Sequence, residues 1–143
     1  MASFLGPSST LDALDLTAPE AEDRLAGLLT AEDAILMLSA ITPDKGRDTV
    51  ALMKNLAMAK AVCGVMAKVP VAHVVYVSSD AVYPFERALV NEESPASPID
   101  LYGSMHRTRE IMFESATKAP VAVLRPTLIY GAGDTHNSYG PNR

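Results

Sequence analysis

The chain has 143 residues, 48% of them hydrophobic and 20% charged, a composition typical of a soluble globular protein. This length suits one compact domain and is too short for two, so we expect residues 1–143 to form a single domain. The net charge of −5, without a cluster of Lys and Arg, argues against a nucleic-acid partner.

The cysteine content and the start of the chain indicate a compartment. The lone Cys63 lies in an apolar segment, which fits an intracellular protein without disulfides. No charged-then-apolar leader opens the chain, and no apolar run approaches the length of a membrane span. We therefore expect a cytoplasmic protein that has no membrane partner.

The first half of the chain predicts helices and a buried strand. Residues 11–16 alternate loosely, as in a short strand, and residues 19–29 are typical of a helix. The apolar run of residues 34–41 predicts a buried strand with a turn-like end. Residues 48–68 are the longest predicted helix, and because apolar residues surround nearly all of it, we expect it to be sandwiched in the core.

The central strand is predicted within residues 72–83, AHVVYVSSDAVY. Its apolar, β-branched run is typical of a strand that is buried on both faces of a parallel sheet. Such a strand places the residues after its carboxyl end in the crevice where ligands bind. Here these residues are Ser78, Ser79 and Asp80.

A second group of candidate site residues lies on the next predicted helix. Ser97 as the N-cap and Pro98 at the first helical position make a favourable start. Tyr102 and His106 are four residues apart and therefore share a face of this helix. Together with Ser79, a phenol and an imidazole form a plausible proton-transfer trio.

Strands and helices alternate along the chain, which predicts an α/β fold with a parallel sheet flanked by helices. Residues 119–124 are the third buried strand, and a loop containing Gly131 and Gly133 comes after it. The pattern is that of a partial Rossmann-like, doubly wound sheet.

The glycine-rich turn of a dinucleotide-binding fold is missing from this sequence. None of the eight glycines fall into G-x-G-x-x-G spacing, and no helix is predicted after Gly131 and Gly133. We therefore expect a truncated domain, in which residues 34–41 form a bare apolar edge that promotes association.

Three segments resemble a known family. The sequences SSDAVY, LYGSMH and LRPTLIYGAGD are similar to the middle of an extended short-chain dehydrogenase/reductase of the NAD-dependent epimerase/dehydratase family. Ser79 stands four residues before Tyr83, as the family's Ser or Thr does. Tyr102 occupies the Tyr of the family's Tyr-x-x-x-Lys, whereas His106 occupies the Lys position.

The resemblance implies a reaction and a role for each of these residues. NAD or NADP would be the cofactor, and a nucleotide sugar or similar hydroxylated molecule would be the substrate. Tyr102 would act as acid and base on a substrate hydroxyl, and Ser79 would hydrogen-bond the same oxygen. The family's Lys holds the nicotinamide ribose and lowers the Tyr pKa.

His106 is a poor replacement for that lysine. A phenol has a free pKa of about 10 and needs a nearby cation to act as a base. A free imidazole with a pKa of roughly 6.5 is mostly neutral at pH 7. The alternative is that His106 is a half-exposed helix residue without a role. Arg107 and Arg109 are nearby but are expected to point to other sectors of the helix.

Two further residues have two interpretations each. Asp80 matches the Asp of the Thr-Asp-Glu run in sugar-nucleotide dehydratases, but Ala81 replaces the Glu, so Asp80 could instead only form a turn. Asn55 is either a partly exposed helix residue or, by the resemblance, a brace for the catalytic region.

These interpretations together define a set of predicted contacts. We expect the substrate to meet Ser79, Asp80 and Thr127. No metal site is predicted, because the chain has one Cys and its three His lie far apart in sequence. We expect the cofactor to meet Ser39, Ala40, Asn55, Ser78, Tyr102, His106, Pro126 and Thr127.

Two functional hypotheses result. The first is an NAD(P)-dependent epimerase/dehydratase-type oxidoreductase, impaired by the missing glycine-rich turn and by His106. The second is a non-catalytic fragment or interaction module that forms a homodimer through the exposed edge of residues 34–41.

Overall fold

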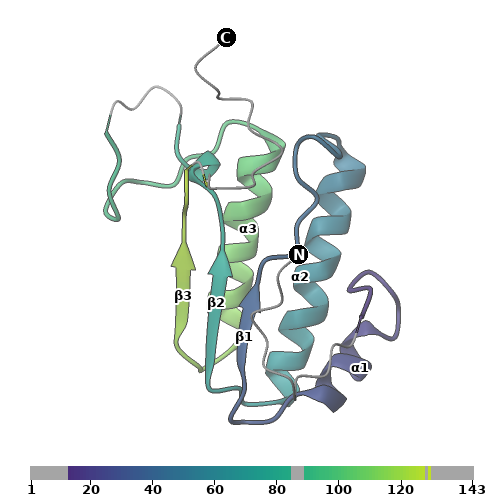
Figure 1. Cartoon of the computed structure of the whole chain (residues 1–143). Coiled ribbons are helices and arrows are strands. Elements are labelled where there is room, and N and C mark those ends of the chain that lie inside the picture. The colour runs from purple at the N-terminus through teal and green to yellow at the C-terminus, as the bar shows by residue number, and fades with distance from the viewer. Residues whose placement is uncertain (1–12, 85–88, 128, 130–143) are drawn as a thin grey trace.

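The computed structural model describes residues 13–84, 89–127 and 129. Its strands form a three-stranded parallel sheet in the order β1-β2-β3, with helices packed against it (Figure 1). This arrangement confirms the predicted α/β fold with a parallel sheet. In chain order the elements are α1 (Ala21–Leu28), β1 (Ala34–Met37), α2 (Thr49–Lys68), β2 (His73–Val77), the short 3-10 helix η1 (Asp80–Val82), α3 (Leu101–Ala116) and β3 (Val121–Leu124).

The strand predicted for residues 11–16 is not found in its described part, residues 13–16. The Asp15 carboxylate instead accepts hydrogen bonds from the Thr17 backbone N–H and hydroxyl, at 2.8 and 2.7 Å. This local turn satisfies the Thr17 backbone amide without a partner strand. Residues 11, 12 and 131–134 lie outside the described residues.

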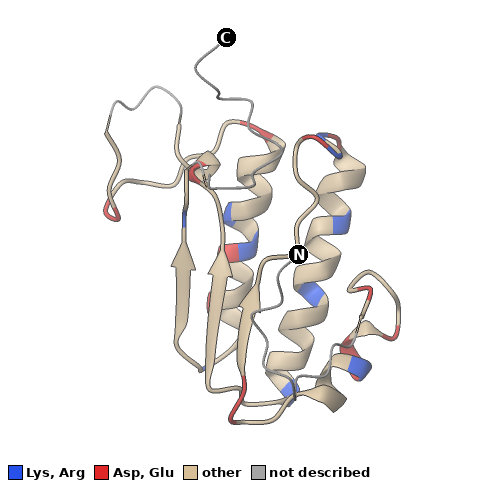
Figure 2. Cartoon of the chain, in the orientation of Figure 1, with Lys and Arg blue, Asp and Glu red and all other residues tan. Residues whose placement is uncertain are grey.

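The sheet is buried on one face only, which corrects the expectation of strands buried on both faces. Val74 and Tyr76 of β2 are buried on the side of α2 and α3. On the other face, Leu36 of β1 and Leu124 of β3 are 59% and 51% exposed. Among the described residues no helix covers this second face (Figure 1). The strands carry no Asp, Glu, Lys or Arg (Figure 2), and His73 of β2 alternates with the buried Val74 and so belongs to this face.

Helix α2 is likewise buried along one side, not sandwiched as predicted. Its buried side includes Ala59 and Val62, whereas Val50 and Met53 are 58% and 62% exposed. With 20 residues and a mean hydropathy of 1.4, α2 is long and apolar enough to cross a membrane, contrary to the expectation that no such run exists. The buried side packs into the protein core, which accounts for this composition.

Helix α3 begins three residues later than the sequence predicted. Asp100, and not Ser97, is the N-cap, and its carboxylate accepts a hydrogen bond from the Gly103 N–H at 2.7 Å. An aspartate accepts a hydrogen bond from a free amide of the first turn, and its negative charge complements the helix dipole. The helix therefore begins after Asp100 and not at Ser97 and Pro98. The core between sheet and helices consists of Met37, Ala59, Val62, Met66, Val71, Val74, Tyr76 and Phe113.

Candidate active site

The carboxyl ends of the three strands bring the predicted site residues to one edge of the sheet. Backbone pairing continues beyond the strands, because Ser78 N–H donates to Leu124 O at 2.7 Å and Asp80 N–H donates to Pro126 O at 3.1 Å. The polar segment after β2 therefore lies beside the segment after β3. Ser39, after β1, lies on the opposite side of β2. This edge is where open parallel sheets bind their ligands.

Ser79 and Tyr102 meet at this edge. Ser79 caps the 3-10 helix η1, with its hydroxyl accepting from the Ala81 N–H at 3.2 Å. Gly103 lets α3 approach this turn, since a Cβ at Gly103 would lie 2.1 Å from the Ala81 carbonyl oxygen. The pKa of Tyr102 is raised, because burial raises it more than the nearby Ser79 side chain lowers it. In this structure the Ser79 hydroxyl donates to the Asp80 carboxylate at 3.2 Å.

His106 is buried and contacts two tyrosines. It is 2% exposed, so the half-exposed interpretation is wrong. The Tyr76 hydroxyl and His106 Nδ1 are hydrogen-bonded at 2.6 Å, and the His106 and Tyr102 ring centroids lie 4.6 Å apart. His106 Nε2 has no partner among the described residues. Burial, helped by the charge of Arg109, lowers the pKa of His106 to about 4. The imidazole is therefore neutral at pH 7 and supplies no charge to Tyr102.

The lowered pKa of His106 makes the fold sensitive to acid. Below its ordinary pKa of 6.5 the unfolded chain binds a proton at His106 that the folded chain refuses down to about pH 4, so stability falls as pH falls. We expect a loss of about 3 kcal/mol of unfolding free energy across this window. Urea unfolding at several pH values measures it. His106→Gln should remove this slope and His73→Gln should keep it; equal slopes in both variants would contradict the assignment.

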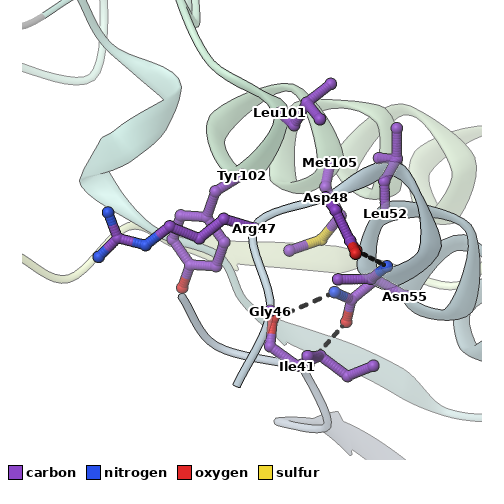
Figure 3. A pocket seen from close by; sticks show the side chains of 10 residues that line it. Ile41, Gly46, Arg47, Asp48, Leu52, Asn55, Leu101, Tyr102 and Met105 are labelled. Carbon is purple, nitrogen blue, oxygen red and sulfur yellow. Dashed lines mark hydrogen bonds between the residues drawn. The ribbon is translucent and has the colours of Figure 1, made fainter. Parts of the chain in front are cut away.

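Asn55 braces the loop after β1 from helix α2. It is 2% exposed, which excludes the partly exposed interpretation. Its Oδ1 accepts from the Ile41 N–H at 2.8 Å and its Nδ2 donates to the Ile41 carbonyl at 3.2 Å (Figure 3). Beside this pair is a small pocket, into which Tyr102 projects from α3 and over which the Arg47 side chain extends (Figure 3). The sequence did not indicate that Arg47 lies here.

A buried carboxylate under the site was also missed. Glu110 is fully buried and accepts hydrogen bonds from the Ser78 hydroxyl at 2.6 Å and the Arg107 guanidinium at 2.9 Å. Arg125 adds a bidentate pair, at 2.9 and 2.8 Å, and also donates to the Tyr83 hydroxyl at 2.7 Å. Ser78 therefore faces this network, which joins the segments after β2 and β3 to α3.

Arg109 is the second buried polar residue that the sequence interpretation misplaced. It lies seven residues after Tyr102, and at about 3.6 residues per turn this returns it to the same face of the helix. The side chain is fully buried, and its guanidinium donates to the Ser39 carbonyl oxygen at 2.9 Å. The signal was present in the sequence: His106, Arg109 and Glu110 are polar residues at core-facing positions of an amphipathic helix.

The described residues fit only part of a dinucleotide. Hydroxyl groups of Ser79 and Tyr102, next to the pocket beside Ile41, suit a nicotinamide ribose or a substrate hydroxyl. A pyrophosphate needs free amides at a helix N-terminus. In α2 and α3 a carboxylate already binds a first-turn amide, from Asp48 to Ala51 and from Asp100 to Gly103. The N-termini of α2 and α3 are therefore each partly occupied by a side chain of this chain. Contacts of Ala40, Pro126 and Thr127 with a cofactor stay predictions.

Comparison with known structures shows the fold of this chain. It is similar to UDP-N-acetylglucosamine 4-epimerase from Bacillus cereus, with a TM-score of 0.72 at 20% identity over 88% of this chain and 48% of that one. It is also similar to UDP-glucuronic acid 4-epimerase from Bacillus cereus in complex with NAD, with a TM-score of 0.64 at 20% identity, covering 75% and 36% of the two chains.

Sequence comparison gives the family. A curated relative is the N-acetyl-alpha-D-glucosaminyl-diphospho-ditrans,octacis-undecaprenol 4-epimerase of Escherichia coli O157:H7, which is 29% identical over 117 residues. The match covers 78% of this chain and 35% of that relative, so the chain spans about a third of the relative's length. The family model described as "NAD dependent epimerase/dehydratase family" matches residues 3–142. Because that match takes in nearly the whole chain, the protein belongs to the NAD-dependent epimerase/dehydratase family, as the resemblance implied.

Proposed function

We propose that this chain carries the acid–base half of an NAD(P)-dependent oxidoreductase that acts on a nucleotide sugar or a similar hydroxylated substrate. The observation that carries the proposal is the close approach of α3, which carries Tyr102, to the η1 turn that Ser79 caps at the carboxyl end of β2. The names of the relatives support the substrate class, since they are 4-epimerases of sugars linked to diphosphates. A cytoplasmic location belongs to the same proposal.

The hydroxyls of Tyr102 and Ser79 would act on the same substrate oxygen in different ways. Tyr102 exchanges a proton with the substrate hydroxyl, and Ser79 holds the oxygen by a hydrogen bond while its charge changes. When bound, the nicotinamide supplies the hydride acceptor that this chemistry requires. Burial raises the Tyr102 pKa, so the phenol is protonated at neutral pH until a neighbouring charge or hydrogen bond offsets the burial.

We infer that the activity of the chain by itself is weak. His106 is neutral at pH 7 and therefore gives Tyr102 no positive charge. Without the glycine-rich turn that holds the pyrophosphate in dinucleotide-binding folds, we expect this chain to bind the cofactor weakly. Both features would slow the proposed oxidoreductase reaction, and neither points to a different reaction.

Calorimetry with NADH tests this proposal. We expect weak but saturable binding, reduced about 3- to 10-fold in Tyr102→Phe and in Ser79→Ala, which is the effect of one lost hydrogen bond. Thr108→Ala, exposed on the same helix, is the matched control and should bind as the parent chain does. No detectable binding, or equal binding by all four proteins, would contradict the proposal.

The alternative is a homodimer through the edge of the sheet. β1 pairs only with β2 among the described strands, and Leu36 and Leu38 on and just after it are 59% and 63% exposed. An unpaired apolar edge is a template for a strand of a second copy. Sedimentation of the sample used for calorimetry separates the two candidates, because dimers that bind no NADH favour the interaction module and NADH-binding monomers exclude it.

A further inference from the structure

Arg109 carries a positive charge into the interior beneath the candidate active site. Its guanidinium carbon lies 5.0 Å from the centre of the Tyr76 ring and 6.0 Å from that of Phe113. The guanidinium donates to the Ser39 carbonyl and to Met105 Sδ, while Nε has no partner among the described residues. Arginine does not lose its proton in proteins, so this site holds a permanent charge.

No carboxylate compensates this charge within the described part of the chain. Every ion pair there that involves an arginine uses Arg107 or Arg125, and both bind Glu110. The titratable groups that interact with Arg109 are instead the phenols of Tyr76 and Tyr102 and the thiol of Cys63, which are neutral at pH 7 and gain a charge only when they lose their protons. Burying an uncompensated cation costs several kcal/mol in real proteins. An arrangement of this cost is more typical of functional sites than of structural ones.

The position of Arg109 connects it to Tyr102 through two rings. Tyr102 contacts the His106 ring, His106 binds the Tyr76 hydroxyl, and Arg109 lies over the Tyr76 ring. Tyr76, His106 and Arg109 are buried, whereas Tyr102 is half-buried and lines the pocket beside Ile41. In the low dielectric of such an interior, a charge acts over a longer range than in water.

We propose that Arg109 is the fixed cation of this site and that it stabilises the phenolate of Tyr102 in place of the lysine that His106 replaces. Arg109 is a positioning residue in this role, because it acts on Tyr102 at a distance. The inference rests on the proposed function, in which Tyr102 is the acid and base.

The other groups that face Tyr102 act in known directions. The Tyr102 pKa is raised by burial, the largest effect, and by the carboxylates of Asp80 and Asp100, while the Ser79 side chain and the charge of Arg109 lower it. His106 is neutral above its pKa of about 4. Arg47, on the loop before α2, lines the same pocket but is exposed and donates to the Pro43 carbonyl.

A tyrosine titration tests the inference without cofactor or substrate. The full chain is labelled with ¹³C at the tyrosine Cζ, and Tyr102→Phe identifies the Tyr102 signal. We expect Arg109→Gln to move the Tyr102 titration to higher pH and Arg109→Lys to keep it near the parent value. Arg107→Gln, on a half-exposed sector of the same helix, removes the same charge and should leave the titration unchanged.

The outcomes separate electrostatic from structural roles. Circular dichroism reports whether each variant is folded over the titrated range, and Arg109→Met, of similar volume and without polar atoms, replaces Arg109→Gln if that variant unfolds. A folded, uncharged Arg109 variant with an unchanged Tyr102 titration would overturn the inference, as would an equal shift in Arg107→Gln. Because no NADH is present, failure of cofactor binding leaves this result intact.

Discussion

Glu110→Ala is expected to lower the free energy of unfolding by about 3 kcal/mol, the effect of removing one partner from a buried ion pair. The Glu110 carboxylate is fully buried and accepts from the Ser78 hydroxyl and from the guanidinium groups of Arg107 and Arg125. Removing it leaves donors at the active-site edge without acceptors. The Arg107 and Arg125 side chains are 35% and 21% exposed, so water can hydrate their guanidinium groups after Glu110 is removed. The expected loss of unfolding free energy is therefore near the lower end of the range of about 3 to 5 kcal/mol for breaking a buried ion pair.

Urea unfolding followed by circular dichroism measures this change at pH 7. Glu114→Ala is the matched control, because Glu114 lies one turn later on α3 and is exposed. Its expected effect is within about 0.5 kcal/mol. The Arg125, Ser78 and Arg107 hydrogen bonds outweigh burial and lower the pKa of Glu110, so its stabilising effect is present above pH 4.5 and is lost as pH falls below that value. Equal stability of the two alanine variants would show that the network does not hold the fold.

Gly103→Ala is expected to destabilise the chain by about 1 to 3 kcal/mol, although alanine is the better helix former. The added Cβ would lie 2.1 Å from the Ala81 carbonyl oxygen and 2.9 Å from Pro98 Cβ. Neither the backbone of the η1 turn nor a proline ring moves freely, so α3 must shift away from Ser79. The Ser79–Tyr102 contact should be lost together with stability.

Gly27→Ala provides a control of opposite sign. Gly27 lies inside α1, where an added Cβ meets no atom within 4 Å. Here only helix propensity acts, so the variant should be more stable by about 0.5 to 1 kcal/mol. Thermal and urea unfolding compare the two variants directly. If Gly103→Ala were also stabilising, the close approach of α3 to the Ala81 carbonyl would not exist in solution.

The fold class and the places of the site residues could be predicted from the amino-acid sequence. Continuous apolar runs separated by helical segments predicted the parallel sheet, because only βα alternation connects parallel strands in this way. The Ser78–Asp80 segment comes after a predicted strand and Tyr102 lies near the start of the next predicted helix, so their approach at one sheet edge was also predictable. The helical periodicity of α3 also places Arg109 and Glu110 on its core-facing side, although the sequence analysis did not predict their burial.

The pairing of these residues could be learned only from the three-dimensional arrangement. His106 binds Tyr76 across 30 residues of sequence, Arg109 reaches Ser39 across 70, and Asn55 binds Ile41 across 14. Such partners depend on the register of the sheet and on the depth at which each helix packs, and neither leaves a local pattern in the sequence. The exposed second face of the sheet was likewise not predictable from the sequence. Apolar strand residues show that a face can be buried, but the neighbouring elements decide whether it is.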